Sequence, residues 1–193
     1  MSTPSFLIFV IVTAITPGPN TILAMINAGK VGFRRSMPFN LGIYLGTNIV
    51  MVICALFSST LYALIPTIKS YMLVIGAAYL LWLAWKTYHS GSDFKTTDQR
   101  EQGFMQGVLL QFVNPKIFIY GLTAFSTYVL QRTDDLSIIV IAGILLATAG
   151  FVAILMWAAF GSLFRRLFSE HGKVINTIMA LLLVYVAVSL FLN

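Results

Sequence analysis

The sequence predicts an all-α integral membrane protein in which six transmembrane helices form two inverted three-helix repeats. Of its 193 residues, 59% are hydrophobic and only 9% are charged, whereas a soluble domain carries about 25% charged residues. Uncharged runs recur along the chain, and a membrane-spanning helix needs about 20 such residues. These observations exclude an ordinary soluble domain, a disordered chain and most nucleic-acid-binding proteins, despite the net charge of +6. No nucleic-acid partner is expected.

The gaps between charged residues place the six spans. They cover about residues 5–28, 39–63, 71–88, 104–130, 137–164 and 174–192. The first run lacks the basic start and cleavage site of a signal peptide, so we expect it to be a span of the mature protein. The polar stretch 90–102 is the one linker in a single transporter domain, residues 1–193, and separates 1–89 from 103–193. Because three spans are an odd number, the second half is inserted upside down.

Lysine and arginine residues predict the orientation. Nine of the 12 lie in the loops after spans 1, 3 and 5 or at their edges, whereas only Lys69 and Arg132 lie in the other loops. Positive loops stay on the cytoplasmic side. The sequence therefore predicts a multi-pass protein with both termini outside and the linker inside. Membrane lipid is the expected environment, and contact of the basic loops with acidic lipid is secondary.

The residues that commonly hold metals do not cluster. The single cysteine, Cys54, lies in an apolar run, and His89 and His171 lie in polar regions. An internal disulfide is therefore excluded, and neither a metal nor a cofactor is expected. No span contains a carboxylate, which disfavours most membrane-embedded hydrolases.

Two proline motifs interrupt spans 1 and 4 at matching depths, ten or eleven residues in. They are Thr16-Pro17-Gly18-Pro19-Asn20 and Asn114-Pro115-Lys116. Proline removes a backbone donor and clashes with the preceding turn, so both helices should break. Asn114 is expected to be an N-cap with Pro115 at the first helical position. Thr16 is expected to cap a second half-helix in the same way.

These motifs predict a substrate-binding site for a zwitterion of amino-acid size. Half-helix N-termini and the charge of Lys116 suit a carboxylate. The freed carbonyls and the amide oxygens of Asn20 and Asn114 suit an ammonium group. The site residues are therefore the eight members of the two motifs. The alternative is a pair of structural kinks, but matched interruptions in two inverted halves favour a transporter site.

Other polar and small residues in the spans have two interpretations. Asn40 and Asn48 are candidates for pore lining, with hydrogen bonding between helices as the alternative. Gln111 is a further candidate for pore lining. Gly42 and Gly46 form a GxxxG pattern that predicts close helix contact within the protomer, with a homodimer as the alternative. The same contact is expected of Gly143 and Gly150.

The motifs resemble those of the LysE/RhtB-type amino-acid exporters of bacterial inner membranes. The matching segments are residues 16–20 (TPGPN), 32–34 (GFR), 76–83 (GAAYLLWL) and 111–116 (QFVNPK). Within that family the chain is most similar to the cysteine/O-acetylserine exporters. That similarity depends on residues 110–113, 120–121, 123–124, 126–127 and 180–185.

The resemblance implies an inner-membrane exporter of small neutral amino acids, with cysteine and O-acetylserine as the expected substrates. Export of homoserine, threonine or another amino acid is the alternative within the family. An alternative of another class is a membrane-embedded enzyme or a subunit that does not transport. Lys116 has no acidic partner within its span, which counts against an enzyme, and a subunit has no need for two matched breaks.

Overall fold

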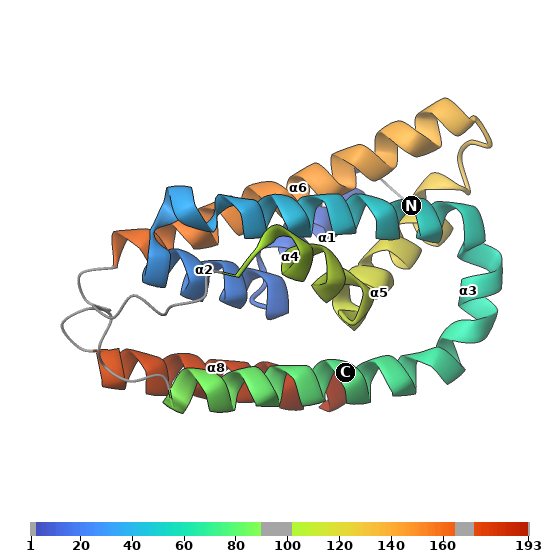
Figure 1. Ribbon diagram of the computed structural model, residues 1–193. Helices are drawn as coiled ribbons and strands as arrows, with labels where there is room; N and C mark the ends of the chain where they lie inside the picture. The colour runs from blue at the N-terminus through green and yellow to red at the C-terminus, as the bar shows by residue number, and fades with distance from the viewer. Residues whose placement is uncertain (1–2, 90–101, 165–171, 193) are drawn as a thin grey trace.

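The computed structural model describes residues 3–89, 102–164 and 172–192, and its regular elements are all helices, as the sequence predicts. The predicted linker at 90–102 lies almost wholly outside the described residues. In chain order the elements are α1 (Thr3–Ile15), α2 (Pro19–Val31), α3 (Phe33–His89), α4 (Phe104–Phe112), α5 (Pro115–Thr123), the π-helix η1 (Ala124–Val129), α6 (Leu136–Leu163) and α8 (Gly172–Leu192) (Figure 1).

Both predicted breaks are confirmed. The chain bends by 44° between α1 and α2, and by 64° between α4 and the α5–η1 segment. Asn114 is the N-cap of α5, and its side-chain oxygen accepts a hydrogen bond of 3.1 Å from the backbone N–H of Lys116. Pro115 follows at the first helical position, where its missing N–H costs nothing.

The expectation that Thr16 caps the second half-helix is wrong, because Gly18 is the N-cap of α2. The Thr16 hydroxyl instead donates to the carbonyl of Val12 at 2.6 Å, within the last turn of α1. Gly18 precedes Pro19, and a residue before proline is pushed out of the helical region. Its backbone N–H donates to the side-chain oxygen of Thr21 at 2.9 Å, as the N3 residue of a capping box does, so this N–H has a partner.

Helix α3 contains the two segments that the sequence assigns to spans 2 and 3. Its 57 residues run without a loop, and the backbone leaves helical geometry at Phe57 (φ −115°, ψ 21°). Figure 1 shows α3 running along one side of the molecule, turning and returning along the other. The two segments are therefore separated by a kink at Phe57, and the helix continues through residues 63–71, where the sequence predicts an interruption.

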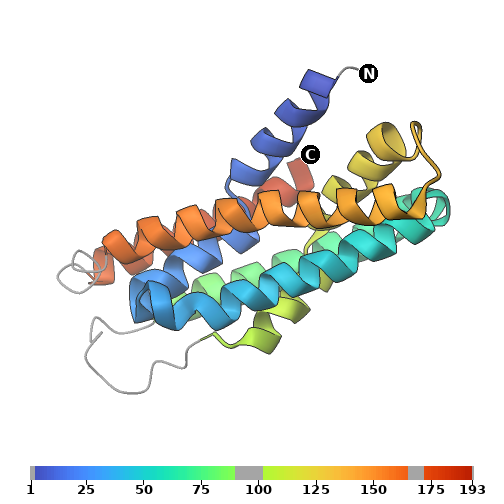
Figure 2. The same cartoon turned by 90° about the horizontal axis from the view of Figure 1, so that it is seen from above.

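The broken segments lie between two outer layers. Figure 1 shows α6 with the first part of α3 on one side, and α8 with the second part of α3 on the other. The main packing pairs are α3 with α4, α2 with α6, and α3 with α8. Almost every residue of α2 is buried. The packing thus holds the N-terminal end of α2 inside the molecule, whereas α1 projects from the bundle (Figure 2).

Close backbone contacts explain part of this packing. A side chain on Gly42 or Gly46 would collide with the backbone of α4, at Phe104 and Val108. The predicted helix contact within the protomer is confirmed at this GxxxG pair. At Gly150 the prediction is wrong, because nothing lies within 4 Å of a Cβ built there.

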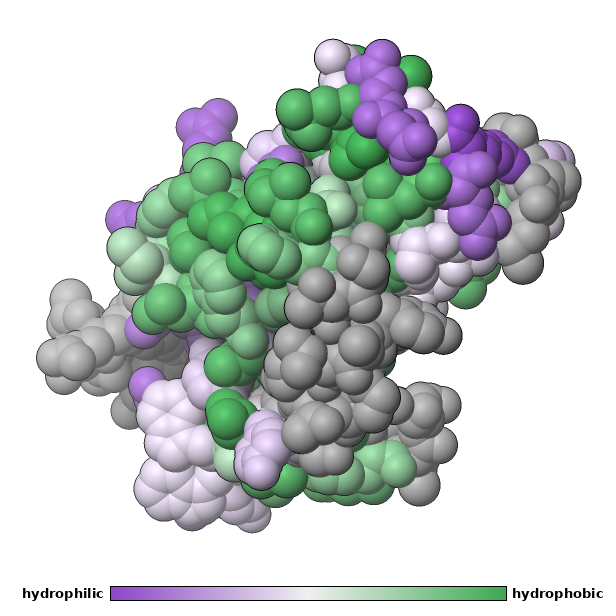
Figure 3. All heavy atoms as spheres, turned by 90° about the vertical axis from the view of Figure 1, so that its right-hand side faces the viewer, coloured by the Kyte–Doolittle hydropathy of each residue, from purple (hydrophilic) through white to green (hydrophobic). Residues whose placement is uncertain are grey.

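Apolar side chains cover much of the surface, as the green areas of Figure 3 show. Among the described residues, Phe33–Phe57 and Leu136–Leu163 are long and apolar enough to cross a membrane, and each of the two bent pairs can add one span. Large side chains such as Ile8, Val12 and Leu145 are more than half exposed. The chain is therefore a membrane protein with multiple apolar helices. The six-span inverted repeat stays a prediction.

The helix ends that flank the basic loops lie together. The α2–α3 junction, the C-terminal ends of α3 and α6 and the beginning of α8 are all at one end of the molecule, at the left in Figure 1. This arrangement is what the positive-inside pattern requires. The sides on which the two termini lie stay a prediction.

Candidate functional site

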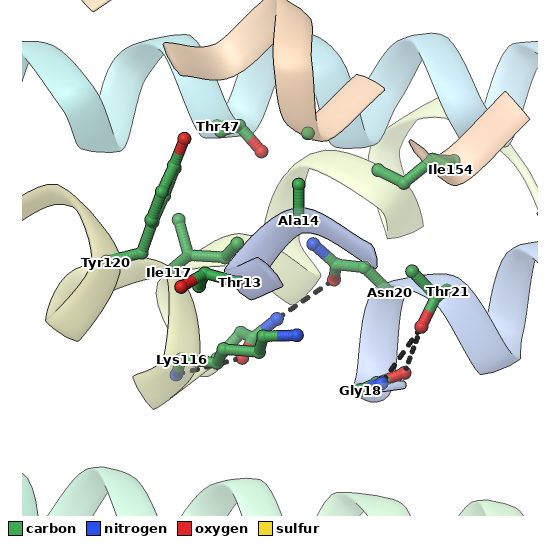
Figure 4. Close-up of a pocket in the computed structure, with 12 residues that line it drawn as sticks. Thr13, Ala14, Gly18, Asn20, Thr21, Thr47, Lys116, Ile117, Tyr120 and Ile154 are labelled. Atoms are coloured by element: carbon green, nitrogen blue, oxygen red, sulfur yellow. Dashed lines mark hydrogen bonds between the residues drawn. The ribbon is translucent and has the colours of Figure 1, made fainter. Parts of the chain in front are cut away.

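The two breaks meet at a small cavity. Twelve side chains and backbone segments line it, namely Thr13, Ala14, Gly18, Asn20, Thr21, Thr47, Asn114, Lys116, Ile117, Tyr120, Gly150 and Ile154 (Figure 4). Its volume is about 40 Å³. A water molecule needs roughly 10–15 Å³ on this measure, so the cavity has room for a few waters. We call it the break cavity, and it must widen before it can hold an amino acid.

Members of both predicted motifs border the break cavity. Gly18 and Asn20 come from the beginning of α2, and Asn114 and Lys116 from the beginning of α5. Two helix N-termini therefore contribute their unpaired N–H groups and positive dipole ends to one place. Together with the ammonium group of Lys116, they make the cavity suited to a carboxylate.

Lys116 links the two breaks directly. Its ammonium nitrogen donates a hydrogen bond of 2.7 Å to the carbonyl oxygen of Thr16. In a continuous helix that oxygen would accept from the N–H four residues later, so the break leaves it available. Gly18 provides the space, because a Cβ there would lie 3.1 Å from Cδ of Lys116. The Lys116 ammonium group is therefore hydrogen-bonded to the Thr16 carbonyl, one of the freed carbonyls that the sequence assigned to the ammonium group of a substrate.

A network of buried amides joins the two halves. The Asn20 amide donates to the side-chain oxygen of Gln111 at 2.7 Å, and Gln111 donates back to the Asn20 oxygen at 3.2 Å. Asn114 donates to the same Asn20 oxygen at 3.0 Å. All three side chains are at most 6% exposed. Both lone pairs of the Asn20 oxygen are therefore used within the protein, and this oxygen holds the break in shape.

The other predicted site residues lie apart from this network. Pro19 and Pro115 line a smaller neighbouring cavity, and the side chains of Thr16 and Pro17 are exposed.

The two asparagines predicted to line a pore have different environments. Asn40 is fully buried, and within the part of the chain that the structure describes neither polar atom of its side chain has a hydrogen-bond partner. The half-buried Asn48 donates to the carbonyl of Tyr44 at 2.8 Å. Their pore-lining role stays a prediction, and so does that of Gln111.

Sequence reasoning missed several residues of the cavity wall. Thr13, Thr21, Thr47 and Tyr120 all contribute to it. One signal was available for Tyr120, which follows Lys116 by four residues and so lies on the same face of α5. Its hydroxyl donates to the carbonyl of Leu146 at 3.3 Å, which attaches α5 to α6. Among residues 3–89, 102–164 and 172–192, no three metal-binding side chains come together.

Sequence comparison identifies related proteins. Residues 11–193 match the family model described as LysE type translocator. The cysteine/O-acetylserine efflux proteins of Salmonella typhimurium and Escherichia coli are each 43% identical to the chain over 187 residues, which cover 97% of the chain and 96% of each relative. No solved structure shows a significant match. The chain therefore belongs to the LysE-type translocator family of amino-acid exporters, which are membrane efflux transporters and not enzymes.

Proposed function

We propose that the protein exports cysteine and O-acetylserine across a bacterial inner membrane. The observation that carries the proposal is the meeting of two helix N-termini and Lys116 at one cavity. The 43% identity to two cysteine/O-acetylserine efflux proteins supports the choice of substrates. A small neutral amino acid also suits a cavity whose neighbouring side chains include Thr13, Thr21 and Thr47 and lack a carboxylate partner for a cationic side chain.

The hydrogen bond between Lys116 and Thr16 imitates the two ends of such a substrate. Lys116 supplies an ammonium group and Thr16 a carbonyl oxygen. When an amino acid enters, its carboxylate pairs with Lys116 and the helix N-termini, and its ammonium group takes the Thr16 carbonyl. Each polar group then exchanges one partner for another, so no buried charge is left unpaired during binding.

The fold proposed for this function is the six-span inverted repeat. The bent pair α1–α2 and the bent pair α4–α5 support it, because each brings a half-helix N-terminus to the break cavity. The first and second parts of α3, together with α6 and α8, supply the other four spans. We place the basic end of the molecule in the cytoplasm, which puts both termini outside.

Uptake into inverted membrane vesicles tests the function. Vesicles that contain the protein should accumulate labelled cysteine and O-acetylserine faster than vesicles without it, and more than threonine, homoserine, leucine or lysine. Preferential uptake of homoserine or threonine would show that the protein exports these amino acids rather than cysteine and O-acetylserine. Equal uptake of every compound with and without the protein would contradict the proposed export.

A further inference from the structure

A second, larger cavity lies where α2 and α3 end. Its volume is about 360 Å³, which is within the range of small-molecule sites. Its walls are formed by Leu23, Ile26, Asn27, Lys30, Val31, Tyr79, Trp82, Leu83, Lys86, Thr87, Gln102 and Gln106. We call it the basic cavity. None of the eight residues of the proline motifs belongs to these walls.

Two ammonium groups face the basic cavity. Lys30 comes from the last turn of α2 and Lys86 from the last turn of α3, and they lie close enough for their charges to repel. The Lys86 nitrogen lies 5.2 Å from the ring centre of Trp82. Two ammonium groups on one wall favour an anionic ligand in this cavity.

Unpartnered amides indicate that the basic cavity is a binding site. Asn27 is only 4% exposed, yet within the described residues its side-chain nitrogen has no hydrogen-bond partner. The side-chain oxygen of Gln102 is also buried and unpartnered there. Buried polar groups are usually paired, so each exception calls for a cause. A ligand that carries both an acceptor and a donor, as a zwitterion does, would satisfy both amides.

A small third cavity lies between the basic cavity and the break cavity. The small cavity beside Pro19 and Pro115 shares Tyr79 with the basic cavity. It shares Asn114 with the break cavity. The three spaces therefore lie in series, with Tyr79 and Asn114 as the partitions between them.

We propose that the basic cavity is an entrance site that binds the carboxylate of a free amino acid before the solute passes Tyr79. Lys30, Lys86 and the Asn27 amide bind the carboxylate, and the Gln102 oxygen accepts from the ammonium group. The inference rests on the proposed function, because it supplies the export site with its substrate. Only a solute from the basic end of the molecule reaches the break cavity by this route.

Transport kinetics of the double variant Lys30→Met/Lys86→Met test the proposal. The KM for labelled cysteine in inverted vesicles should rise about 5- to 30-fold, the range expected between a surface ion pair and a charge-assisted hydrogen bond, while kcat stays unchanged. Lys173→Met is the matched control, since it removes an exposed charge near the beginning of α8 and outside the cavity wall. An unchanged KM in the double variant would show that both lysines only offset helix dipoles and would overturn the proposal.

Two further measurements distinguish a failure of the proposed entrance site from a failure of the proposed export function. Cysteamine, which lacks the carboxylate, should inhibit cysteine uptake weakly and equally in the wild type and the double variant; stronger inhibition of the wild type would argue against carboxylate recognition. Asn27→Ala, which keeps both charges, should also raise the KM, and it replaces the double variant if that protein does not fold. If the wild type transports no amino acid, the proposed function fails, and equilibrium binding of cysteine to purified wild type and double variant still decides whether the cavity is a site.

Discussion

The ammonium nitrogen of Lys116 donates a hydrogen bond of 2.7 Å to the carbonyl oxygen of Thr16, 100 residues earlier in the chain. The bond connects the end of α1 with the beginning of α5, so it joins the two interrupted segments. It also places a positive charge beside two helix N-termini, an arrangement that repels cations and attracts anions. A zwitterionic substrate can replace this bond, because its carboxylate can pair with Lys116 and its ammonium group with the Thr16 carbonyl.

Gly18 should be required for the position of Lys116. In Gly18→Ala the new Cβ lies 3.1 Å from Cδ and 3.2 Å from Nζ of Lys116, so this flexible side chain must shift by a few tenths of an ångström. Folding should survive, and transport should fall roughly tenfold because the charge is displaced. Gly103→Ala is the control, since nothing lies within 4 Å of its Cβ. Equal transport by the two variants would disprove the positional role.

The buried amide network should contribute to stability. Gln111→Leu leaves the Asn20 amide without its 2.7 Å partner, and an unsatisfied buried donor costs about 1–3 kcal/mol. For a protein of this size, the melting temperature in detergent should fall by roughly 3–10 °C. The exposed Gln131, which donates to the carbonyl of Ser126, provides the control Gln131→Leu. A melting temperature equal to that of the control would mean that the network contributes nothing.

Two glycines of α6 should respond differently to alanine. A Cβ on Gly161 would collide with the backbone carbonyl of Met25 in α2, which cannot move without separating the helices. Gly161→Ala should therefore destabilise the protein by about 1–3 kcal/mol or more. Gly150→Ala meets nothing within 4 Å and should leave stability unchanged or raise it by up to about 1 kcal/mol. Thermal unfolding of the two variants checks this, and similar melting temperatures would show that α2 and α6 are not in close contact.

The proposed orientation predicts that the C-terminus lies on the periplasmic side of the membrane. A fusion of alkaline phosphatase at Asn193 should be active, since this enzyme needs the periplasm, whereas a fluorescent protein at the same position should be dark. Fusions in the linker 90–102 should show the opposite pattern. A fluorescent fusion at Asn193 would mean that the C-terminus is cytoplasmic, and the six-span arrangement would have to be abandoned.

Local sequence rules predict the helix ends but not the contacts across the molecule. Proline geometry and N-cap chemistry act over a few residues, so Asn114 and Pro115 lie where the sequence predicts them. The cap at Gly18 was missed because two prolines compete for the same break. Between residues 58 and 70 there is no glycine to end a helix but there is a proline, Pro66, and α3 nevertheless continues through the expected interruption, with its kink earlier, at Phe57.

The interior of the site depends on distances that the sequence does not contain. Asn20 and Gln111 are 91 positions apart, and their pairing follows only from how α2 and α4 pack. The sequence assigned the Asn20 oxygen to the ammonium group of a substrate and Gln111 to pore lining, and neither assignment anticipates that the two side chains pair with each other. It also assigned Lys116 to the carboxylate of a substrate. In the structure the Lys116 ammonium group instead donates a hydrogen bond to the Thr16 carbonyl.

Transport by Lys116→Met tests the central claim most directly. Methionine keeps the length and apolar bulk of the side chain but removes its charge and its hydrogen bond to Thr16. At matched membrane abundance, cysteine transport should fall roughly 10- to 150-fold, the loss of one charge-assisted hydrogen bond. Lys116→Arg should restore it only partly, and Lys173→Met should transport normally. Normal cysteine transport by Lys116→Met would contradict a carboxylate site at the two breaks.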